Sequence, residues 1–268
     1  MVLSDVIFST SIAQAYDHCM VPLKFEPYAR DLARRVAELQ PERILETAAG
    51  TGIVTGLMAR ALPGAHIIAT DLNRAMLDVA AERLASTNVI FLAADAQSLP
   101  FADASFDAVV CQFGVMFFPD RVGAYREAWR VLRPGGHFLF NAWDRIEHNP
   151  VSYIVSSTVA SLFPADPPSF YDRVPFGYHD KAQIEADLAA AGFDQFIIET
   201  ISAEGHISSA ADAARGLCLG SPIRSEIEER AAGRLDEVIT KVAEALDRAS
   251  YGSGAVSPLL ARVMTAVR

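Results

Sequence analysis

A glycine-rich segment, Glu46-Thr-Ala-Ala-Gly50-Thr-Gly52, follows an apolar run at residues 43–46 and precedes a stretch with helical spacing. This order predicts a strand, a tight turn and a helix start. Because glycine lacks a Cβ and tolerates positive φ, Gly50 and Gly52 let the backbone approach a ligand closely. The carboxylate of Glu46 can hold a polar group of that ligand. A tight turn that binds nothing fits the segment equally well, so the downstream residues must decide.

Polar residues also end the next predicted strands. Asp71 ends the second strand, about 20 residues after Gly52, where a carboxylate can accept hydrogen bonds from both hydroxyls of a ribose. Asp71 can equally cap the helix that follows it. Asp95 and Ala96 follow the third strand, and Gln112 ends the fourth. The carboxylate of Asp95 and a neighbouring backbone N–H can together recognise the polar edge of adenine.

The turn itself narrows the kind of adenosine ligand. A dinucleotide-binding loop has a third glycine that permits close helix packing, but position 55 is threonine and Gly56 stands one place late. The chain also contains no GxxxxGK[ST] segment, so a nucleoside triphosphate would lack its lysine. An adenosine that carries an uncharged or zwitterionic group remains, held partly by Glu46. S-adenosylmethionine fits that description.

Apolar runs separated by helical spacing predict the fold around these residues. The five strands are placed at residues 43–46, 66–71, 89–93, 106–112 and 137–143, with helices between them. A further helix is expected at residues 26–39. Asp71 and Asn73 should cap a helix that runs through Ala85, and Pro134-Gly135-Gly136 should stop the helix that carries Trp129 and Leu132. The alternation is typical of a parallel α/β sheet.

The second half of the chain predicts a helical cap and two more strands. Residues 147–180 carry the proline-rich segment Pro164-Ala-Asp-Pro167-Pro168, interpreted as an insertion near the active site. A helix is expected at residues 180–191, two helices at 209–249, and strands at 196–201 and 259–267. We therefore expect an N-terminal helical lid at residues 1–40, a cofactor-binding core at 41–146, and cap insertions with the last two strands of the same domain at 147–268.

Composition excludes several classes of function. The chain has 268 residues, 51% of them hydrophobic and 21% charged, and no apolar stretch approaches the roughly 20 residues of a membrane helix. Its first residues show no secretory signal. A net charge of −10 disfavours a nucleic-acid partner. Cys19, Cys111 and Cys218 form no CxxC pair, which argues against a metal site or disulfides and fits a cytoplasmic protein.

Taken in order, the motifs resemble those of class I S-adenosylmethionine-dependent methyltransferases over residues 43 to about 143. The first motif of that family, [DE]xGxGxG, matches Glu46–Gly52 with Ala48 in place of the first glycine. The resemblance implies an α/β, Rossmann-like, doubly wound, mostly parallel seven-stranded sheet with an antiparallel last strand and a helical cap. It implies a cofactor site formed by Glu46, Thr47, Ala48, Gly50, Gly52, Asp71, Leu72, Met76, Asp95, Ala96, Gln112 and Phe113.

Within the family, the chain is similar to the small-molecule methyltransferases of ubiquinone and menaquinone biosynthesis. Ser11-Ile-Ala-Gln-Ala-Tyr16-Asp17 resembles part of their opening motif, whereas residues 21–28 depart from it. The resemblance supports the subclass but not a quinone substrate. We expect a small, partly apolar acceptor because the cap is rich in alanine, leucine and aromatic residues.

Methyl transfer asks little of catalytic side chains. The sulfonium already activates the methyl group, so the protein must align the acceptor in line with the breaking bond and exclude water. An acceptor that loses a proton needs a base, for which Tyr16, His18, Tyr28 and His148 are weak candidates, with Asp144 and His179 beside them. Two alternatives stay open: an NAD(P)-dependent oxidoreductase, and a cofactor-binding protein without transferase activity.

Overall fold

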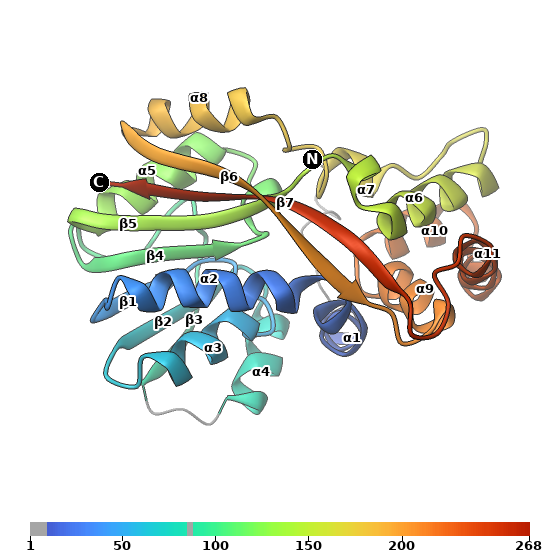
Figure 1. The fold of residues 1–268 in the computed structure, drawn as a ribbon, viewed down its shortest axis with the longest axis horizontal. Coiled ribbons are helices and arrows are strands. Elements are labelled where there is room, and N and C mark those ends of the chain that lie inside the picture. Colours follow the sequence, from blue (N-terminus) through green and yellow to red (C-terminus); the bar gives the residue numbers. More distant parts are fainter. Residues whose placement is uncertain (1–9, 85–87) are drawn as a thin grey trace. The chain divides into compact units, whose positions relative to one another are not determined.

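The computed structural model of the chain describes residues 10–84 and 88–268 (Figure 1). Three expectations fall partly or wholly outside this range: the absence of a secretory signal, the first part of the 1–40 lid, and the helix end at Ala85. The chain divides into two compact units. The sheet unit comprises Tyr28–Trp143, Tyr178–Ile201 and Ala261–Arg268, and the helical unit comprises Met1–Pro27, Asp144–Gly177 and Ser202–Leu260.

Seven strands form one sheet, in the order β3-β2-β1-β4-β5-β7-β6. Strands β1 to β5 pair in parallel, and β7 runs antiparallel to β5, with His137 opposite Val267. This order confirms the predicted fold class and places β6 at one edge. The strands are β1 Arg43–Glu46, β2 His66–Asp71, β3 Val89–Ala93, β4 Phe106–Gln112, β5 Leu132–Trp143, β6 Gln195–His206 and β7 Val256–Val267.

Helices cover both faces of this sheet. On one face, apolar residues of α2 and α3 pack on Ile44, Ile67, Val110 and Leu139, which alternate with residues of the opposite face. On the other face, Tyr125 of α5 packs against rings of β5. The helices of the sheet unit are α2 Glu26–Glu38, α3 Ile53–Ala61, α4 Arg74–Arg83, η3 Val115–Phe117, α5 Arg121–Val131 and α8 Lys181–Ala191. The predicted helix at 180–191 is confirmed: Asp180 caps its start, and Gly192 follows its end at φ 103°.

The helix expected between the third and fourth strands was wrong. Residues 94–105, which are all described, form a loop of turns with one isolated bridge, Asp95 to Ser98. Pro100 and several short polar residues interrupt any helical period there. No helix therefore covers β3 on the α5 side, and Ile90 remains 63% exposed.

The end of α5 also differs from the prediction. The helix stops at Val131, and Leu132 already begins β5, so Leu132 is not helical. Pro134-Gly135-Gly136 lies inside this strand instead of before it. The register explains the difference, because Phe106 faces Leu132 while Ala108 faces His137, so the glycines form a bulge. Gly135 adopts φ 78°, which that bulge requires.

The helical unit holds three helices where two were expected at residues 209–249, so that prediction was wrong. Gly220 and Pro222 separate α9 from α10, and Gly233, with φ 84°, separates α10 from α11. The helices of this unit are α1 Thr10–Ala15, η2 Tyr16–Phe25, η4 Ile146–His148, α6 Pro150–Leu162, α7 Phe170–Arg173, α9 Ala210–Leu219, α10 Ile223–Arg230 and α11 Leu235–Arg248.

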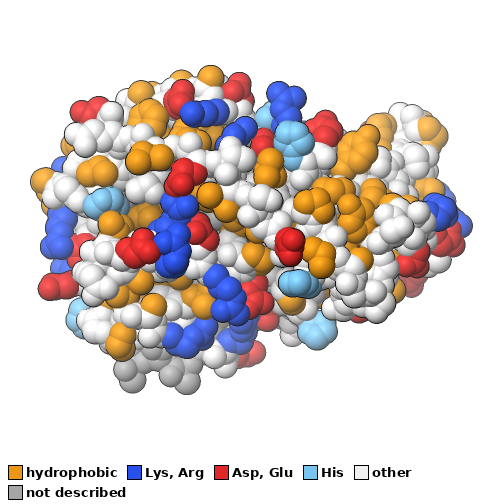
Figure 2. All heavy atoms as spheres, viewed as in Figure 1, with side chains coloured by type: hydrophobic (Ala, Val, Ile, Leu, Met, Phe, Trp, Pro, Cys, Tyr) orange, Lys and Arg blue, Asp and Glu red, His pale blue; other side chains and the backbone are white. Residues whose placement is uncertain are grey.

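Charge and hydropathy of the described elements agree with the composition. None of the described helices combines the length and apolarity that crossing a bilayer requires. Figure 2 shows one face of the molecule, on which lysine and arginine side chains are interspersed with acidic ones. That face therefore offers no continuous basic patch of the kind that phosphate backbones require.

Candidate functional site

The loop after β1 has a backbone that its glycines make possible. Gly50 and Gly52 adopt φ values of 57° and 78°, in the left-handed region. A Cβ added at Gly52 would lie 2.9 Å from the Cβ of Ala80, so α4 packs directly against this position. A Cβ at Gly50 would meet nothing within 4 Å. The loop is thus closely packed at Gly52 and open at Gly50, where a ligand can reach the backbone.

Ala48, which replaces the first glycine of the motif, also adopts a left-handed conformation, with φ 52°. A side chain pays a conformational cost there that glycine would avoid. Its methyl group is accommodated by Gly114, where an added Cβ would lie 2.5 Å from that of Ala48. Sequence analysis identified the departure at Ala48 but not the glycine that makes room for it.

Glu46 is a buried acid whose oxygens are held by two threonines. Its side-chain Oε2 accepts a hydrogen bond from Thr55 Oγ1 at 2.6 Å, and its backbone oxygen accepts one from Thr70 Oγ1 at 3.0 Å. Burial raises the pKa of Glu46 to about 8, against the effect of the Thr55 bond, and nearby Asp71 raises it further. A cationic group placed here would favour the ionised acid.

The position of Thr55 also bears on the dinucleotide alternative. Where a dinucleotide loop has its third glycine, this chain has the threonine that bonds Glu46. Close packing is supplied one place later, because a Cβ at Gly56 would lie 2.7 Å from the side chain of Leu84, the residue that follows α4. Sequence analysis missed Thr55 and Thr70, although a hydroxyl three residues beyond the last glycine is a usable signal.

Asp71 ties the end of β2 to the glycine loop. Its Oδ2 accepts a hydrogen bond from Gly50 N at 2.9 Å, and its Oδ1 accepts one from Asn73 N at 2.7 Å. Burial raises the pKa of Asp71, and these backbone hydrogen bonds oppose the rise. The next residue, Leu72, is 58% exposed, whereas Met76 is buried. An exposed apolar side chain beside a carboxylate suits the face of a nucleoside.

Asp95 and Ala96 lie in the loop after β3, and both are partly exposed. The Oδ1 of Asp95 accepts a hydrogen bond from Gln97 N at 2.8 Å, and the side-chain amide of Gln97 donates to the same carboxylate. The carboxylate is thus oriented by its own turn. The backbone N–H of Ala96 stands next to it, as the recognition of adenine would require.

The end of β4 carries Gln112 and Phe113, and an aromatic cluster surrounds the latter. Phe113 stacks on Trp143 with ring centroids 3.9 Å apart, and Tyr28 meets both rings edge-on. Phe113 has φ 48°, and its N–H donates to Asn141 Oδ1 at 2.9 Å. Sequence analysis missed Asn141, which a polar residue within the apolar run of β5 could have indicated.

The candidate bases have different surroundings. Tyr28 belongs to the sheet unit, is buried, and donates its hydroxyl to the carbonyl of Ile201 at 3.0 Å, which is a structural arrangement. Tyr16, His18 and His148 belong to the helical unit. Tyr16 stacks on Phe25, and exposed His148 places Nδ1 3.3 Å from Asp144 Oδ2. That pair can orient an imidazole, whereas His18 is simply exposed.

All the predicted cofactor-binding residues lie in the sheet unit; Met76 lies in α4, and the others lie at or just beyond the carboxyl ends of β1 to β4. Two buried polar atoms beside them, Thr51 Oγ1 and Asn141 Nδ2, have no hydrogen-bond partner within the described residues. With the open position at Gly50 and the exposed side chain of Leu72, they fit a ligand that has polar ends and an aromatic base. Across residues 10–84 and 88–268, no three His, Cys, Asp or Glu side chains are grouped to hold a metal ion.

Comparison with known proteins agrees with this geometry. Residues 45–140 match the family described as "Methyltransferase domain". The demethylmenaquinone methyltransferase of Clavibacter sepedonicus is 46% identical over 107 residues, which are 40% of this chain and 43% of that protein. The ubiquinone/menaquinone biosynthesis C-methyltransferase UbiE of Pseudomonas aeruginosa strain LESB58 is 33% identical over 167 residues, 57% of this chain and 65% of that protein. The chain thus spans about half the length of these relatives.

A solved structure shows the same fold over most of the chain. The YcgJ protein of Bacillus subtilis superposes with a TM-score of 0.57 at 24% identity, covering 90% of this chain and 98% of that one. This likeness extends beyond the segment matched in sequence, and at this identity it concerns the fold alone. From residue 45 to residue 140, the chain is therefore similar in sequence to the methyltransferase domain family.

Proposed function

We propose that this protein transfers the methyl group of S-adenosylmethionine to a small, partly apolar acceptor. The observation that carries the proposal is the double role of Asp71, whose two oxygens hold Gly50 N and Asn73 N. One carboxylate thereby fixes the glycine loop while its remaining lone pairs stay available to a ribose. The match of residues 45–140 to the methyltransferase domain family supports methyl transfer as the reaction at this site.

Each residue has a role in this proposal. Asp71 would accept from the ribose hydroxyls, with Leu72 and Met76 against the base and Asp95 with Ala96 at its polar edge. Glu46 would hold the ammonium of the methionine portion, with Thr47 and Ala48 beside it. Gly50 and Gly52 would bring the backbone close, and Gln112 and Phe113 would line the same portion. When bound, the cofactor supplies an activated methyl group, so that no covalent enzyme intermediate is needed.

The identity of the acceptor does not follow from the relatives, because the sequence match leaves much of this chain uncovered. The relatives' names refer to quinone precursors, yet the match to them covers about half their length. A demethylated quinone is the first acceptor to test. The aromatic cluster of Phe113, Trp143 and Tyr28 supports a planar, partly apolar molecule.

Calorimetric titration tests the cofactor. Wild-type protein should bind S-adenosylhomocysteine and ignore NADH and NADPH. Asp71→Asn should weaken binding about 10- to 100-fold, since hydrogen bonds to a charged group contribute about 1.5–3 kcal/mol. Asp78→Asn is the matched control, because Asp78 is an exposed carboxylate of α4 that pairs with Arg74. Binding of a dinucleotide instead, or equal losses in both variants, would refute the proposed site.

Methyl transfer must then be measured directly. Protein that binds the thioether should transfer a radiolabelled methyl group from S-adenosylmethionine to one of a panel of phenols, quinols and amines. A demethylated quinol heads the panel. Tight binding with no transfer to any member would favour the alternative of a cofactor-binding protein without transferase activity.

A further inference from the structure

The loop after β3 has no helix to give it shape, yet it carries the two residues proposed to recognise adenine. Its backbone is hydrogen-bonded to the end of α5 instead. Ala104 N donates to the carbonyl of Arg130 at 3.0 Å, and Ser105 N donates to that of Val131 at 2.7 Å. These bonds fix the far end of the loop, and Ala94 N, which donates to the carbonyl of Asp71 at 3.1 Å, fixes its first residue. Between these points, the segment from Asp95 to Leu99 is held to α5 by side chains.

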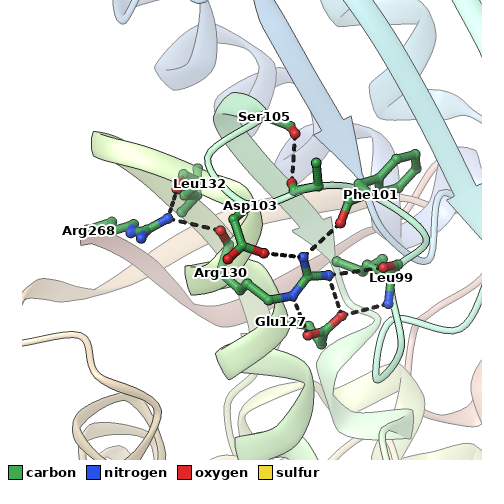
Figure 3. Close-up of polar contacts among 9 residues, drawn as sticks. Leu99, Phe101, Asp103, Ser105, Glu127, Arg130, Leu132 and Arg268 are labelled. Carbon is green, nitrogen blue, oxygen red and sulfur yellow. Dashed lines mark hydrogen bonds and ion pairs between the residues drawn. The ribbon is translucent and has the colours of Figure 1, made fainter.

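Arg130 holds the middle of this loop through hydrogen bonds from all three nitrogens of its guanidinium (Figure 3). Its Nη2 donates to the carbonyl of Leu99 at 3.0 Å, and its Nη1 donates to the carbonyl of Phe101 and to Asp103 Oδ1, both at 2.7 Å. The remaining donors meet Glu127, with Nε bonded to Oε1 at 2.7 Å and Nη2 to Oε2 at 2.8 Å. The five N–H groups of arginine match these five contacts.

Glu127 completes the grip from the same helix. Its Oε2 accepts a hydrogen bond from Leu99 N at 2.8 Å, so that Leu99 is held at both its N–H and its carbonyl. The Leu99 side chain is itself buried. Glu127 and Arg130 keep each other ionised, because their hydrogen bonds lower the pKa of Glu127 and raise that of Arg130.

A second contact, through Gln97, joins the same loop to the start of α5. Gln97 donates its side-chain amide to the Asp95 carboxylate at 3.2 Å and accepts a hydrogen bond from Asp120 N at 2.9 Å. Asp120 is the N-cap of α5. The segment Asp95–Leu99 is therefore held by both ends of α5: Gln97 contacts its start, and Leu99 contacts residues near its end. Ala96 lies within this segment.

From these contacts we infer that Arg130 and Glu127 are positioning residues that set the base specificity of the cofactor site. The inference rests on the proposed function. It adds that side chains of α5 determine the positions of Asp95 and Ala96, the two residues proposed to recognise adenine. Lysine cannot replace Arg130, because one ammonium cannot reach two carbonyls and two carboxylates in the fixed directions of a guanidinium.

The test compares two thioether ligands that differ only in the base. S-inosylhomocysteine presents an oxygen where adenine has its amine, and a ring N–H where adenine has an acceptor. Against Asp95 and the N–H of Ala96 it is mismatched at both points, so wild-type protein should prefer S-adenosylhomocysteine by about 100-fold or more. Arg130→Met should reduce this preference to about 10-fold or less, mainly through weaker binding of the adenosine ligand.

Matched variants separate positioning from general damage. Arg126→Met is the control, because Arg126 is an exposed residue of α5 that donates to the carbonyl of Ala190 and not to the loop. It should keep the wild-type preference, whereas Arg130→Lys should behave like Arg130→Met. Gln97→Met removes the other fastening without touching the core and should lower the preference severalfold, which keeps the test decisive if Arg130→Met does not fold.

A preference that stays unchanged in Arg130→Lys and Gln97→Met would overturn the inference, as would equal weakening of both ligands. A shift of the same size in Arg126→Met would also overturn it. Wild-type protein that binds neither ligand would refute the proposed function itself. That result is distinguishable from adenosine binding with an unchanged preference.

Discussion

The two loops that frame the proposed cofactor site are built in opposite ways. The loop after β1 takes its shape from its own backbone, with left-handed residues at Ala48, Gly50 and Gly52. The loop after β3 takes its shape from distant side chains, chiefly Arg130 and Glu127 of α5. The conformation of a loop that depends on its own glycines can be predicted from a short segment of sequence. The conformation of a loop that depends on distant side chains cannot, because the segment itself does not indicate which residues will contact it.

The largest effect expected of a single substitution at one pH tests the backbone of the first loop. Gly52→Ala should lower the free energy of unfolding by about 3 kcal/mol, since it combines a left-handed φ with a Cβ 2.9 Å from that of Ala80. Gly50→Ala shares the left-handed φ but has open space, and should cost only about 1 kcal/mol. Chemical denaturation of the ligand-free variants measures the difference. Equal losses would show that α4 yields to the added methyl group.

A pH series tests the buried acid of the first loop. Burial raises the pKa of Glu46 to about 8 from an ordinary 4.5, so the folded protein keeps a proton that the unfolded chain releases. Its contribution to stability is therefore full below about pH 4.5 and is lost as the pH rises toward 8. Relative to Glu46→Gln, the free energy of unfolding of the wild type should fall by up to about 1.4 kcal/mol per pH unit in this window.

Parallel stability curves for wild type and Glu46→Gln would contradict a raised pKa. Thr55→Val provides a further check, because removing the 2.6 Å bond to Oε2 leaves burial unopposed. Because that bond lowers the pKa of Glu46, its loss should raise this pKa further and extend the fall in stability to higher pH.

The smallest effects test the second loop one contact at a time. Asp103 is 74% exposed, so Asp103→Ala should cost at most about 0.5 kcal/mol of unfolding free energy. Glu127→Ala removes the acceptor of Leu99 N and two bonds from Arg130, and should cost about 2 kcal/mol. Thermal denaturation of both variants measures the contrast. A larger loss for Asp103→Ala than for Glu127→Ala would mean that the exposed ion pair between Arg130 and Asp103 stabilises the loop more than Glu127 does.

Local signals predicted much of the fold. The bounds of β1 to β4 follow from apolar runs interrupted by polar and turn residues, and α8 follows from Asp180 and Gly192. The errors arose where a pattern did not decide between structures. Residues 94–105 are long enough for a helix but contain Pro100, and Pro134–Gly136 suits a turn as well as the bulge that it forms.

The site was predictable to the extent that it is local in sequence. Glu46 and Asp71 end strands, Gly50 and Gly52 follow the first of these, and the structure places all four at neighbouring strand ends. The contacts that orient them were less accessible. Asn141 meets the backbone of Phe113 across 28 positions of sequence, and Arg130 meets Leu99 across 31. Such pairings depend on the register of the sheet and on where α5 ends, which periodicity does not specify.

The close contact between Ala48 and Gly114 limits how this sequence can change. An alanine at 114 would place its methyl group 2.5 Å from that of Ala48 and 2.7 Å from the sulfur of Cys111. Two neighbours would have to shrink or shift before any side chain could enter. Ala48 can be replaced by glycine in a single substitution, whereas Gly114 cannot be replaced until these neighbours change. The side chains at positions 48 and 111 thus determine together whether position 114 can accept any residue larger than glycine.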